Sequence, residues 1–268
     1  MRVTRCITVL AGVLLAAPLP AQWLNYPTAG VPRTSSGQPD LTGPAPKAAD
    51  GKPDFSGMWT AADPLPCDGV TRICGDLAIT RQFTNLGFGL KDGLPYSEWA
   101  REEMKQRVGK VDPYTRCIAP GGPRMHLLPT MKKMVQTPRL LVILDEYNAS
   151  YRQIFLDGRP LPEDPQPTWN GYSSGHWESG TLVVESAGFR DDQWLDAGRS
   201  PITSAAKVTE RFRRPNFGNM EIEVTVNDPK AYTRPWTALV KQTAVLDTDL
   251  LDAICLENEK DLPHLPGK

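Results

Sequence analysis

The sequence is poor in histidine and has no surplus of either charge. Its 268 residues include three histidines, and 30 Lys and Arg residues stand against 31 Asp and Glu residues, which leaves a net charge of −1. A dedicated nucleic-acid-binding protein needs a basic surface that neutralises phosphates, so this class is excluded. A zinc site built from histidines would need all three, although they are far apart in the chain. We therefore expect no nucleic-acid partner, no metal and no cofactor.

Long hydrophobic runs are also missing, apart from one at the start of the chain. Arg2 and Arg5 precede an apolar stretch over residues 7–15, and Ala21 follows two prolines as a small residue suited to cleavage. This pattern is typical of a secretory signal peptide, here residues 1–21, and the apolar stretch is too short for a permanent membrane anchor. The sequence therefore predicts a secreted or periplasmic protein with no membrane span after cleavage.

Cysteine is scarce, and export decides how it is interpreted. Cys6 leaves with the signal peptide, so four cysteines remain in an oxidising compartment: Cys67, Cys74, Cys117 and Cys255. Four cysteines allow three pairings, of which we favour Cys67–Cys74 because this pair closes a short loop, with Cys117–Cys255 as the second disulfide. A four-cysteine zinc site is the alternative, but it lacks the paired C-x2-C spacing.

Proline (26) is more frequent than glycine (22), which excludes a mostly helical bundle. Residues 22–54 are rich in both and have no apolar period, so we expect an extended tether. Within this tether the run Gly37 to Gly43 recurs fourteen residues later as Gly51 to Gly57. From residue 55 to residue 268 the pattern predicts one β-rich domain.

Short strands with turns between them dominate this domain. We expect a first strand over 55–60, a loop-rich insertion over 61–138 with one helix capped by Ser97, and then further strands, the last of them the least certain, over 139–145, 151–156, 172–178, 181–187, 207–213, 220–226, 235–241 and 250–255. No alternation of strands and helices is visible, so the sheet should be antiparallel. The fold class is therefore mainly β, an antiparallel lipocalin-like β-barrel or a β-sandwich, with a loop-plus-helix insertion.

A resemblance supports the barrel. Gly57-x-Trp59 on a first strand before an antiparallel meander resembles the lipocalin-like (calycin) barrels. The runs over residues 171–173, 175–178, 181–185, 194–196, 208–214 and 228–232 resemble a family of bacterial secreted proteins without an assigned function. The resemblance covers most of residues 37–268 and implies export and a shared fold, but no reaction. The chain departs from this family between Gly198 and Lys207, which leaves open any activity that depends on that stretch.

The hairpin at Ser179-Gly180 determines which candidate site residues share a face. Tyr172, His176 and Glu185 lie on one face, and the other carries Trp177, Leu182 and Val184. If the Trp177 face is the core, the His176 face is simply solvated. If the His176 face lines a barrel cavity, its three polar residues form a ligand site, and His176 with the Glu185 carboxylate acts as a catalytic general base.

Two loop acids, Asp192 and Asp196, follow this hairpin. With Trp194 between them they would point the same way in an extended stretch. Solvated loop acids and a calcium site are both compatible with this pattern, although the calcium-loop motif is missing. In the cavity interpretation, we expect both acids near the mouth of the ligand site.

The sequence contains no G-x-S-x-G elbow, H-E-x-x-H, P-loop or dinucleotide-binding fingerprint. We expect an exported protein that binds a small, partly apolar molecule in a β-barrel. One alternative is a cofactor-free hydrolase, lyase or isomerase that uses His176 with a carboxylate. The other is a structural or interaction module of the cell envelope. Whether the protein is an enzyme, and its oligomeric state, stay open.

Overall fold

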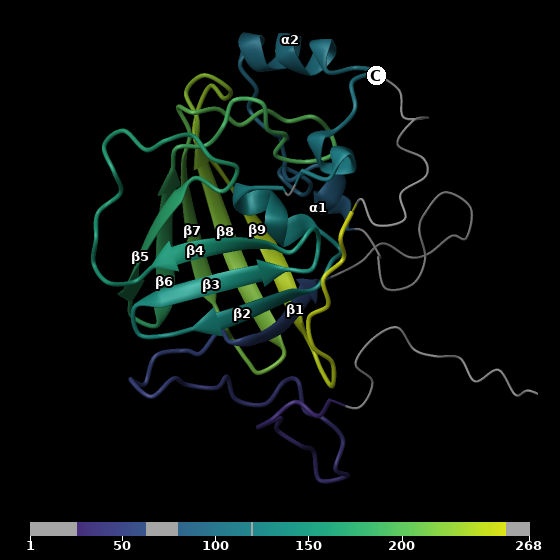
Figure 1. Ribbon diagram of the computed structural model, residues 1–268, viewed down its shortest axis with the longest axis vertical. Helices are drawn as coiled ribbons and strands as arrows, with labels where there is room; N and C mark the ends of the chain where they lie inside the picture. Colours follow the sequence, from purple (N-terminus) through teal and green to yellow (C-terminus); the bar gives the residue numbers. More distant parts are fainter. Residues whose placement is uncertain (1–25, 63–79, 119, 256–268) are drawn as a thin grey trace, which may run out of the picture.

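The chain folds into a nine-stranded barrel. The structure, a computed structural model, describes residues 26–62, 80–118 and 120–255. The strands of this part of the chain are β1 (Gly57–Ala61), β2 (Lys132–Gln136), β3 (Leu140–Asp145), β4 (Ser150–Phe155), β5 (Tyr172–Glu178), β6 (Thr181–Ala187), β7 (Lys207–Arg213), β8 (Asn219–Asn227) and β9 (Trp236–Val245). They pair in chain order, and β1 also pairs with β9, so the barrel is closed (Figure 1). This closure confirms the barrel and excludes the sandwich.

One pair of neighbouring strands departs from the expected antiparallel arrangement. β4 and β5 run parallel, and only Ile154 with Ser173 and Phe155 with Ser174 are paired between them. The expectation of a purely antiparallel sheet is therefore wrong at this place. The reason is the long connection over residues 156–171, which carries the chain back along the wall so that β5 starts in the same direction as β4 (Figure 1).

Most strands lie where their period-two pattern predicts. The hairpin between β5 and β6 has the expected register, with Glu178 opposite Thr181, and Ser179 and Gly180 adopt the positive φ angles (45° and 85°) that a two-residue turn requires. β2 was not predicted as a strand. The predicted strand over 250–255 reduces to a single bridge between Ala253 and Tyr147 among the described residues.

The core follows from the alternation along the strands. On β8, Met220, Ile222, Val224 and Val226 are all fully buried, while the residues between them are half-buried or exposed. Trp59 on β1 joins the same apolar cluster, and its Nε1 donates to the Phe55 carbonyl at 2.9 Å. The interior of the barrel along these strands is therefore filled with side chains.

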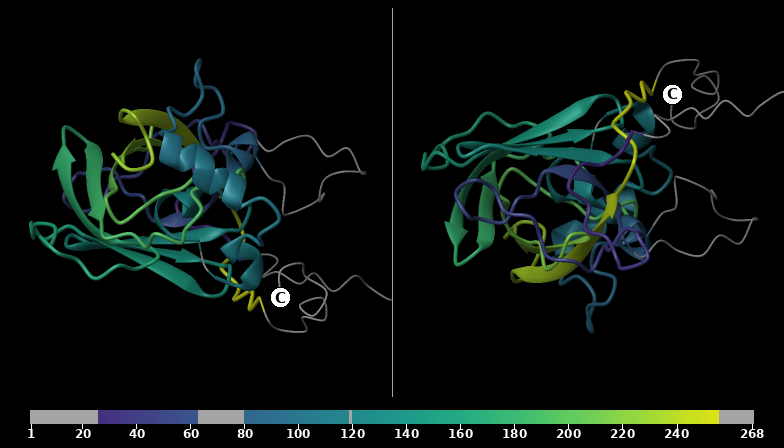
Figure 2. Two further views of the ribbon diagram at one scale, coloured as in Figure 1. Left: turned by 90° about the horizontal axis from the view of Figure 1, so that it is seen from above. Right: turned by 90° about the horizontal axis from the view of Figure 1, so that it is seen from below.

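Short helices cover the upper end of the barrel (Figure 2). They are α1 (Arg81–Thr84), α2 (Glu98–Gln106) and the 3-10 helices η1 (Pro113–Arg116) and η2 (Gly122–Leu127). α2 confirms the predicted helix, because the Ser97 hydroxyl accepts from the Ala100 N–H at 3.1 Å. η2 is buried along its whole length, and its His126 contacts Phe212 on β7 and Gln242 on β9.

The expected tether contains two copies of the same turn. The Asp40 N–H donates to the Pro32 carbonyl at 2.8 Å, and fourteen residues later the Asp54 N–H donates to the Pro46 carbonyl at 3.0 Å. Seen from below, this segment crosses the lower end of the barrel (Figure 2). The sequence repeat is therefore a repeat of local structure.

The first copy of the repeat contacts the barrel through its backbone. Phe217 N–H donates to the Gly43 carbonyl and Gly218 N–H donates to the Leu41 carbonyl, both at 2.8 Å. In the second copy, Phe55 N–H donates to Oε1 of Gln136 at 2.9 Å. Of the tether expected over residues 22–54, the described part from residue 26 contacts the β7–β8 turn and β2.

Candidate functional site

A cluster of polar side chains lies inside the barrel, at strand positions where the pattern demands apolar residues. It consists of Arg152 on β4, Ser173 on β5, Ser186 on β6, Glu210 on β7 and His126 on η2. Each of these residues is at most 1% exposed. Buried charges are stable only when they are paired and hydrogen-bonded, so the contacts within this cluster determine which of its groups are charged.

Arg152 and Glu210 form a bidentate ion pair at the centre of the cluster. Nη1 of Arg152 donates to Oε1 of Glu210 at 3.1 Å, and Nη2 donates to Oε2. Nη2 also donates to the Ser186 hydroxyl at 2.9 Å, and Nε donates to the Ser173 hydroxyl at 3.3 Å. Burial alone raises the pKa of the Glu210 carboxyl, but the Arg152 charge and the hydrogen bond from His126 lower it to about 2. Glu210 is therefore a carboxylate at neutral pH.

His126 is the third member of this network. Burial lowers the pKa of its imidazole, against the opposing effect of Glu210, so the ring is neutral at pH 7. Its Nε2 lies 2.9 Å from Oε1 of Glu210. A carboxylate only accepts, so Nε2 carries the proton and Nδ1 carries a lone pair. Nδ1 has no hydrogen-bond partner among the described residues.

Gln242 on β9 joins the network from the other side. Its Nε2 donates to the His126 carbonyl at 2.7 Å, which fixes the end of η2 against the barrel wall. Its Oε1 is buried and, like Nδ1 of His126, lacks a partner within the part of the chain that the structure describes. The cluster therefore holds a neutral imidazole in one tautomer and leaves two buried acceptors free.

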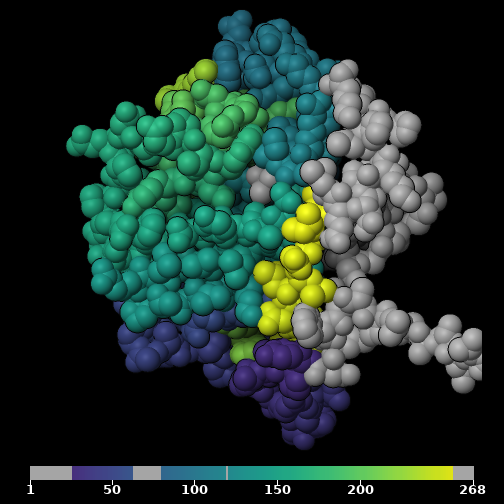
Figure 3. All heavy atoms as spheres, in the orientation of Figure 1, coloured from purple at the N-terminus to yellow at the C-terminus, as the bar shows by residue number. Residues whose placement is uncertain are grey.

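A hollow opens in the barrel wall beside this cluster. It has a volume of about 500 Å³ and lies between the first half of β4 and the segment over residues 168–173. β5 begins only where β4 ends, so no strand pairs with the outer edge of β4 there. Arg152 and Ser173 belong both to the buried cluster and to the lining of the hollow. Figure 3 views this face and shows it hollowed beside β4.

Aromatic side chains surround the hollow. Tyr151 is 60% exposed, and the Tyr172 ring stacks on Phe155 with the ring centroids 5.2 Å apart. Trp169, near the end of the long connection, lies across the hollow from β4. The Asn170 side chain spans the two sides, because its Nδ2 donates to the Tyr151 carbonyl at 2.9 Å. An apolar, ring-lined hollow with a few polar groups is typical of small-molecule sites.

The structure places the predicted site residues of the hairpin on the outer face of the barrel, and of these Tyr172 belongs to the lining of the hollow. Tyr172 is half-buried, Glu185 is exposed and the His176 side chain is 55% exposed. Nε2 of His176 lies 3.0 Å from Oε1 of Glu178 on the same outer face. The register is confirmed, but the inward direction that the cavity hypothesis required is wrong, because Leu182 and the residues in phase with it fill the core.

The two loop acids separate in the structure. Asp192 is exposed and pairs with Arg190, with Oδ2 2.7 Å from Nη2. Asp196 is fully buried and accepts from the Leu86 N–H at 3.0 Å and from the Ser200 hydroxyl at 2.7 Å. Burial raises the pKa of Asp196, and its hydrogen bonds lower it less strongly. Asp196 therefore ties two loops together instead of lining the mouth of a site.

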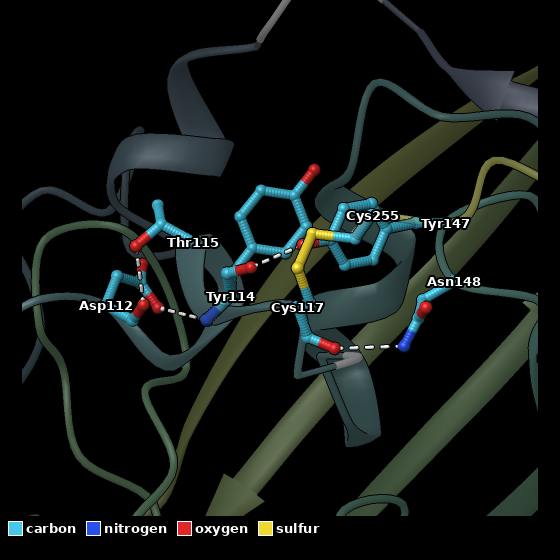
Figure 4. The surroundings of a disulfide bond; sticks show 7 residues. All are labelled: Asp112, Tyr114, Thr115, Cys117, Tyr147, Asn148 and Cys255. Atoms are coloured by element: carbon cyan, nitrogen blue, oxygen red, sulfur yellow. Dashed lines mark hydrogen bonds between the residues drawn. A yellow bond between two sulfur atoms is a disulfide. The ribbon is translucent and has the colours of Figure 1, made fainter. Parts of the chain in front are cut away.

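One disulfide connects the middle of the chain to its C-terminal part. Cys117 and Cys255 are bonded, as the pairing with Cys67–Cys74 requires, while Cys67 and Cys74 lie outside the described residues. Figure 4 shows the bond beside the Tyr147 ring, and Nδ2 of Asn148 donates to the Cys117 carbonyl at 3.0 Å. The disulfide lies outside the barrel and holds the chain after β9 against η1 and the β3–β4 turn.

Comparisons of the sequence with models of protein families and with curated proteins find no match. Within the described ranges, no group of three His, Cys, Asp or Glu side chains is arranged to hold a metal ion. In the same residues, no helix has the length and apolar character needed to cross a bilayer. A function for the candidate site must therefore be inferred from its geometry.

Proposed function

We propose that the protein binds a small, partly apolar molecule in the hollow beside β4. The observation that carries this proposal is that an aromatic-lined hollow meets a buried polar cluster at Arg152 and Ser173. Rings supply apolar contact area, and a few fixed polar groups orient a ligand. The volume of about 500 Å³ suits a molecule of one or two rings.

The position of the ligand differs from the sequence-based hypothesis. A ligand inside the barrel competes with a core that is already filled by residues such as Trp59, Phe212 and Ile222. The hollow needs no such displacement because it opens to solvent. The enzyme alternative used His176 with Glu185, but the His176 imidazole contacts Glu178 on an exposed face, which gives no enclosed site for a general base.

Export of the protein is part of the same proposal. The Cys117–Cys255 disulfide favours an oxidising compartment, since cytosolic thiols are kept reduced. The closed barrel agrees with a lipocalin-like fold. We infer that residues 1–21 are removed as a signal peptide and that the chain is related to the secreted bacterial family it resembles.

A screen of ring-containing small molecules by ligand-observed NMR tests the binding proposal. Molecules that bind the wild type should lose affinity for Tyr151→Ala and Trp169→Ala. Tyr26→Ala is the matched control, because Tyr26 is 58% exposed, close to the 60% of Tyr151, and lies outside the hollow. If no molecule binds, or if Tyr26→Ala weakens binding equally, the hollow is not a binding site and the envelope-module alternative becomes the better one.

A further inference from the structure

We infer that the ligand of the hollow is a neutral sugar ring. This inference rests on the proposed function and specifies its ligand class. Three properties of the lining carry it: its charge, the kind of hydrogen-bonding groups it offers, and the aromatic rings beside them. Each property excludes a different class of ligand.

The charge of the lining excludes ionic ligands. Among the described residues that line the hollow, Arg152 is the single charged one, and its guanidinium is already hydrogen-bonded to Glu210 and two serines. Arg190 and Arg159 lie beside the rings of Trp169 and Phe155 but are each paired with an aspartate. A charged ligand would lose its hydration without gaining a counter-charge, so a neutral ligand is favoured.

The polar groups of the lining match hydroxyls. Ser150, Tyr151 and Gln153 belong to the lining of the hollow, and their side chains have no hydrogen-bond partner in the described part of the chain. Hydroxyl and amide groups can donate and accept, and so can every hydroxyl of a sugar. A purely apolar ring would leave these groups without partners, while a polyhydroxylated ring satisfies several of them at once.

The aromatic rings supply the remaining element. A pyranose presents C–H groups on its faces and hydroxyls around its rim, so an aromatic ring packs against a face while polar groups bond the rim. Tyr151 is free for such a contact because it is 60% exposed and stacks on no other ring among the described residues. Trp169 stands on the opposite side of the hollow. A pyranose bound between Tyr151 and Trp169 would contact their aromatic rings and, at the same time, the amide and hydroxyl groups of the lining.

The test compares three groups of probes by saturation-transfer NMR on the full chain with its Cys117–Cys255 disulfide intact. The probes are neutral methyl hexopyranosides, the corresponding uronates, and phenol with cyclohexylmethanol as rings without a rim of hydroxyls. At least one neutral glycoside should bind, and its uronate should bind more weakly. Tyr151→Ala should weaken binding about tenfold or more, and Gln153→Ala should weaken it several-fold. Tyr26→Ala should leave it unchanged.

The outcomes separate the ligand class from the site. If phenol or cyclohexylmethanol binds in a Tyr151-dependent way and no neutral glycoside does, the sugar assignment is wrong and the binding site stands. Preferential binding of the uronates also overturns the assignment. If no probe binds in a Tyr151-dependent way, the proposed function fails and the sugar assignment fails with it. Thermal unfolding of each variant shows whether a loss of binding comes from a loss of fold.

Discussion

Replacing one partner of the Arg152–Glu210 ion pair should lower the free energy of unfolding far more than replacing both partners together. Arg152→Met leaves the Glu210 carboxylate buried without its counter-charge, and Glu210→Met leaves the guanidinium in the same position. Removing one partner of a buried pair typically costs about 3–5 kcal/mol of stability. The double variant replaces the pair by apolar side chains and should recover most of this loss, apart from about 1–2 kcal/mol for the hydroxyls and imidazole that lose partners.

The pKa of Glu210 gives a second view of the same magnitude. Its decrease from 4.5 to about 2 corresponds to about 3 kcal/mol in favour of the charged form in the folded protein. Because the pKa of Glu210 is lower in the folded than in the unfolded protein, its contribution to the free energy of unfolding is complete above the pKa of the unfolded state. This contribution is lost as the pH falls towards 2. In Arg152→Met the lost counter-charge raises the pKa of Glu210, so this part of the acid destabilisation between pH 4.5 and 2 should disappear.

The assay is urea unfolding at pH 7 for the wild type, both single variants and the double variant, followed by tryptophan fluorescence. The four stabilities give a coupling energy, which we expect to be at least about 3 kcal/mol. Arg213→Met is the control, because Arg213 is exposed on β7, the strand that carries Glu210. This substitution should change the free energy of unfolding by less than about 0.5 kcal/mol. Single-variant effects that add within about 0.5 kcal/mol would refute the argument, since Arg152 and Glu210 would then act independently.

Three further predictions follow from other contacts. Replacing Cys117 and Cys255 by Ser should lower the free energy of unfolding by up to about 5 kcal/mol, because their bond closes a loop of 138 residues and restricts the unfolded chain. An unchanged midpoint of urea unfolding would contradict this reasoning. Burial lowers the pKa of His126 in the folded protein, so the free energy of unfolding should decrease as the pH falls below about 6.5. Parallel stability profiles of the wild type and His126→Gln between about pH 7 and 5 would disprove this. In thermal unfolding, His176→Ala should be within about 0.5 kcal/mol of the wild type because the His176 side chain is exposed. Trp177→Ala should be about 2–4 kcal/mol less stable because Trp177 packs against the core. The reverse order would show that the two faces of the hairpin are misassigned.

The strands that the sequence predicted well are those with an uninterrupted period of two. β8 is the clearest case, since each inward position is apolar. β2 was missed because its first inward residue is Lys132, which looks like a surface residue. In the structure this lysine is fully buried, and its Nζ donates to the Leu128 carbonyl at 3.1 Å and to the Thr130 carbonyl at 2.9 Å. Backbone carbonyls of a loop are not visible as partners in a sequence.

The direction of the hairpin faces could not be obtained from the turn alone. The turn fixes which residues share a face, and this part of the prediction is confirmed. The choice of the inner face depends on which side offers more packed apolar area. Leu182 and Val184 are fully buried and decide this choice, so the usual inside-out rule gives the correct direction. The cavity hypothesis for His176 required the opposite.

The buried cluster had a sequence signal, but its partners could not be paired from sequence. Glu210 shares a face with Val208 and Phe212, and Arg152 shares one with Ile154, so each charge lies in the apolar phase of its strand. A charge in such a position needs a partner in the core. β4 and β7 are separated by two strands in the barrel, and only the closed barrel brings Arg152 and Glu210 together.

The parallel pairing of β4 and β5 connects this cluster to the hollow. Since β5 begins beside the end of β4, the first half of β4 has no neighbouring strand on that side, and Asn170 takes part of its place. The same Asn170 side chain accepts from the Gly122 N–H at 3.2 Å, at the start of the helix that carries His126. One amide therefore holds both the edge of the hollow and the helix of the buried network. A change at Asn170 should act on ligand binding and on the His126 environment together, whereas a change at Tyr151 should act on binding alone.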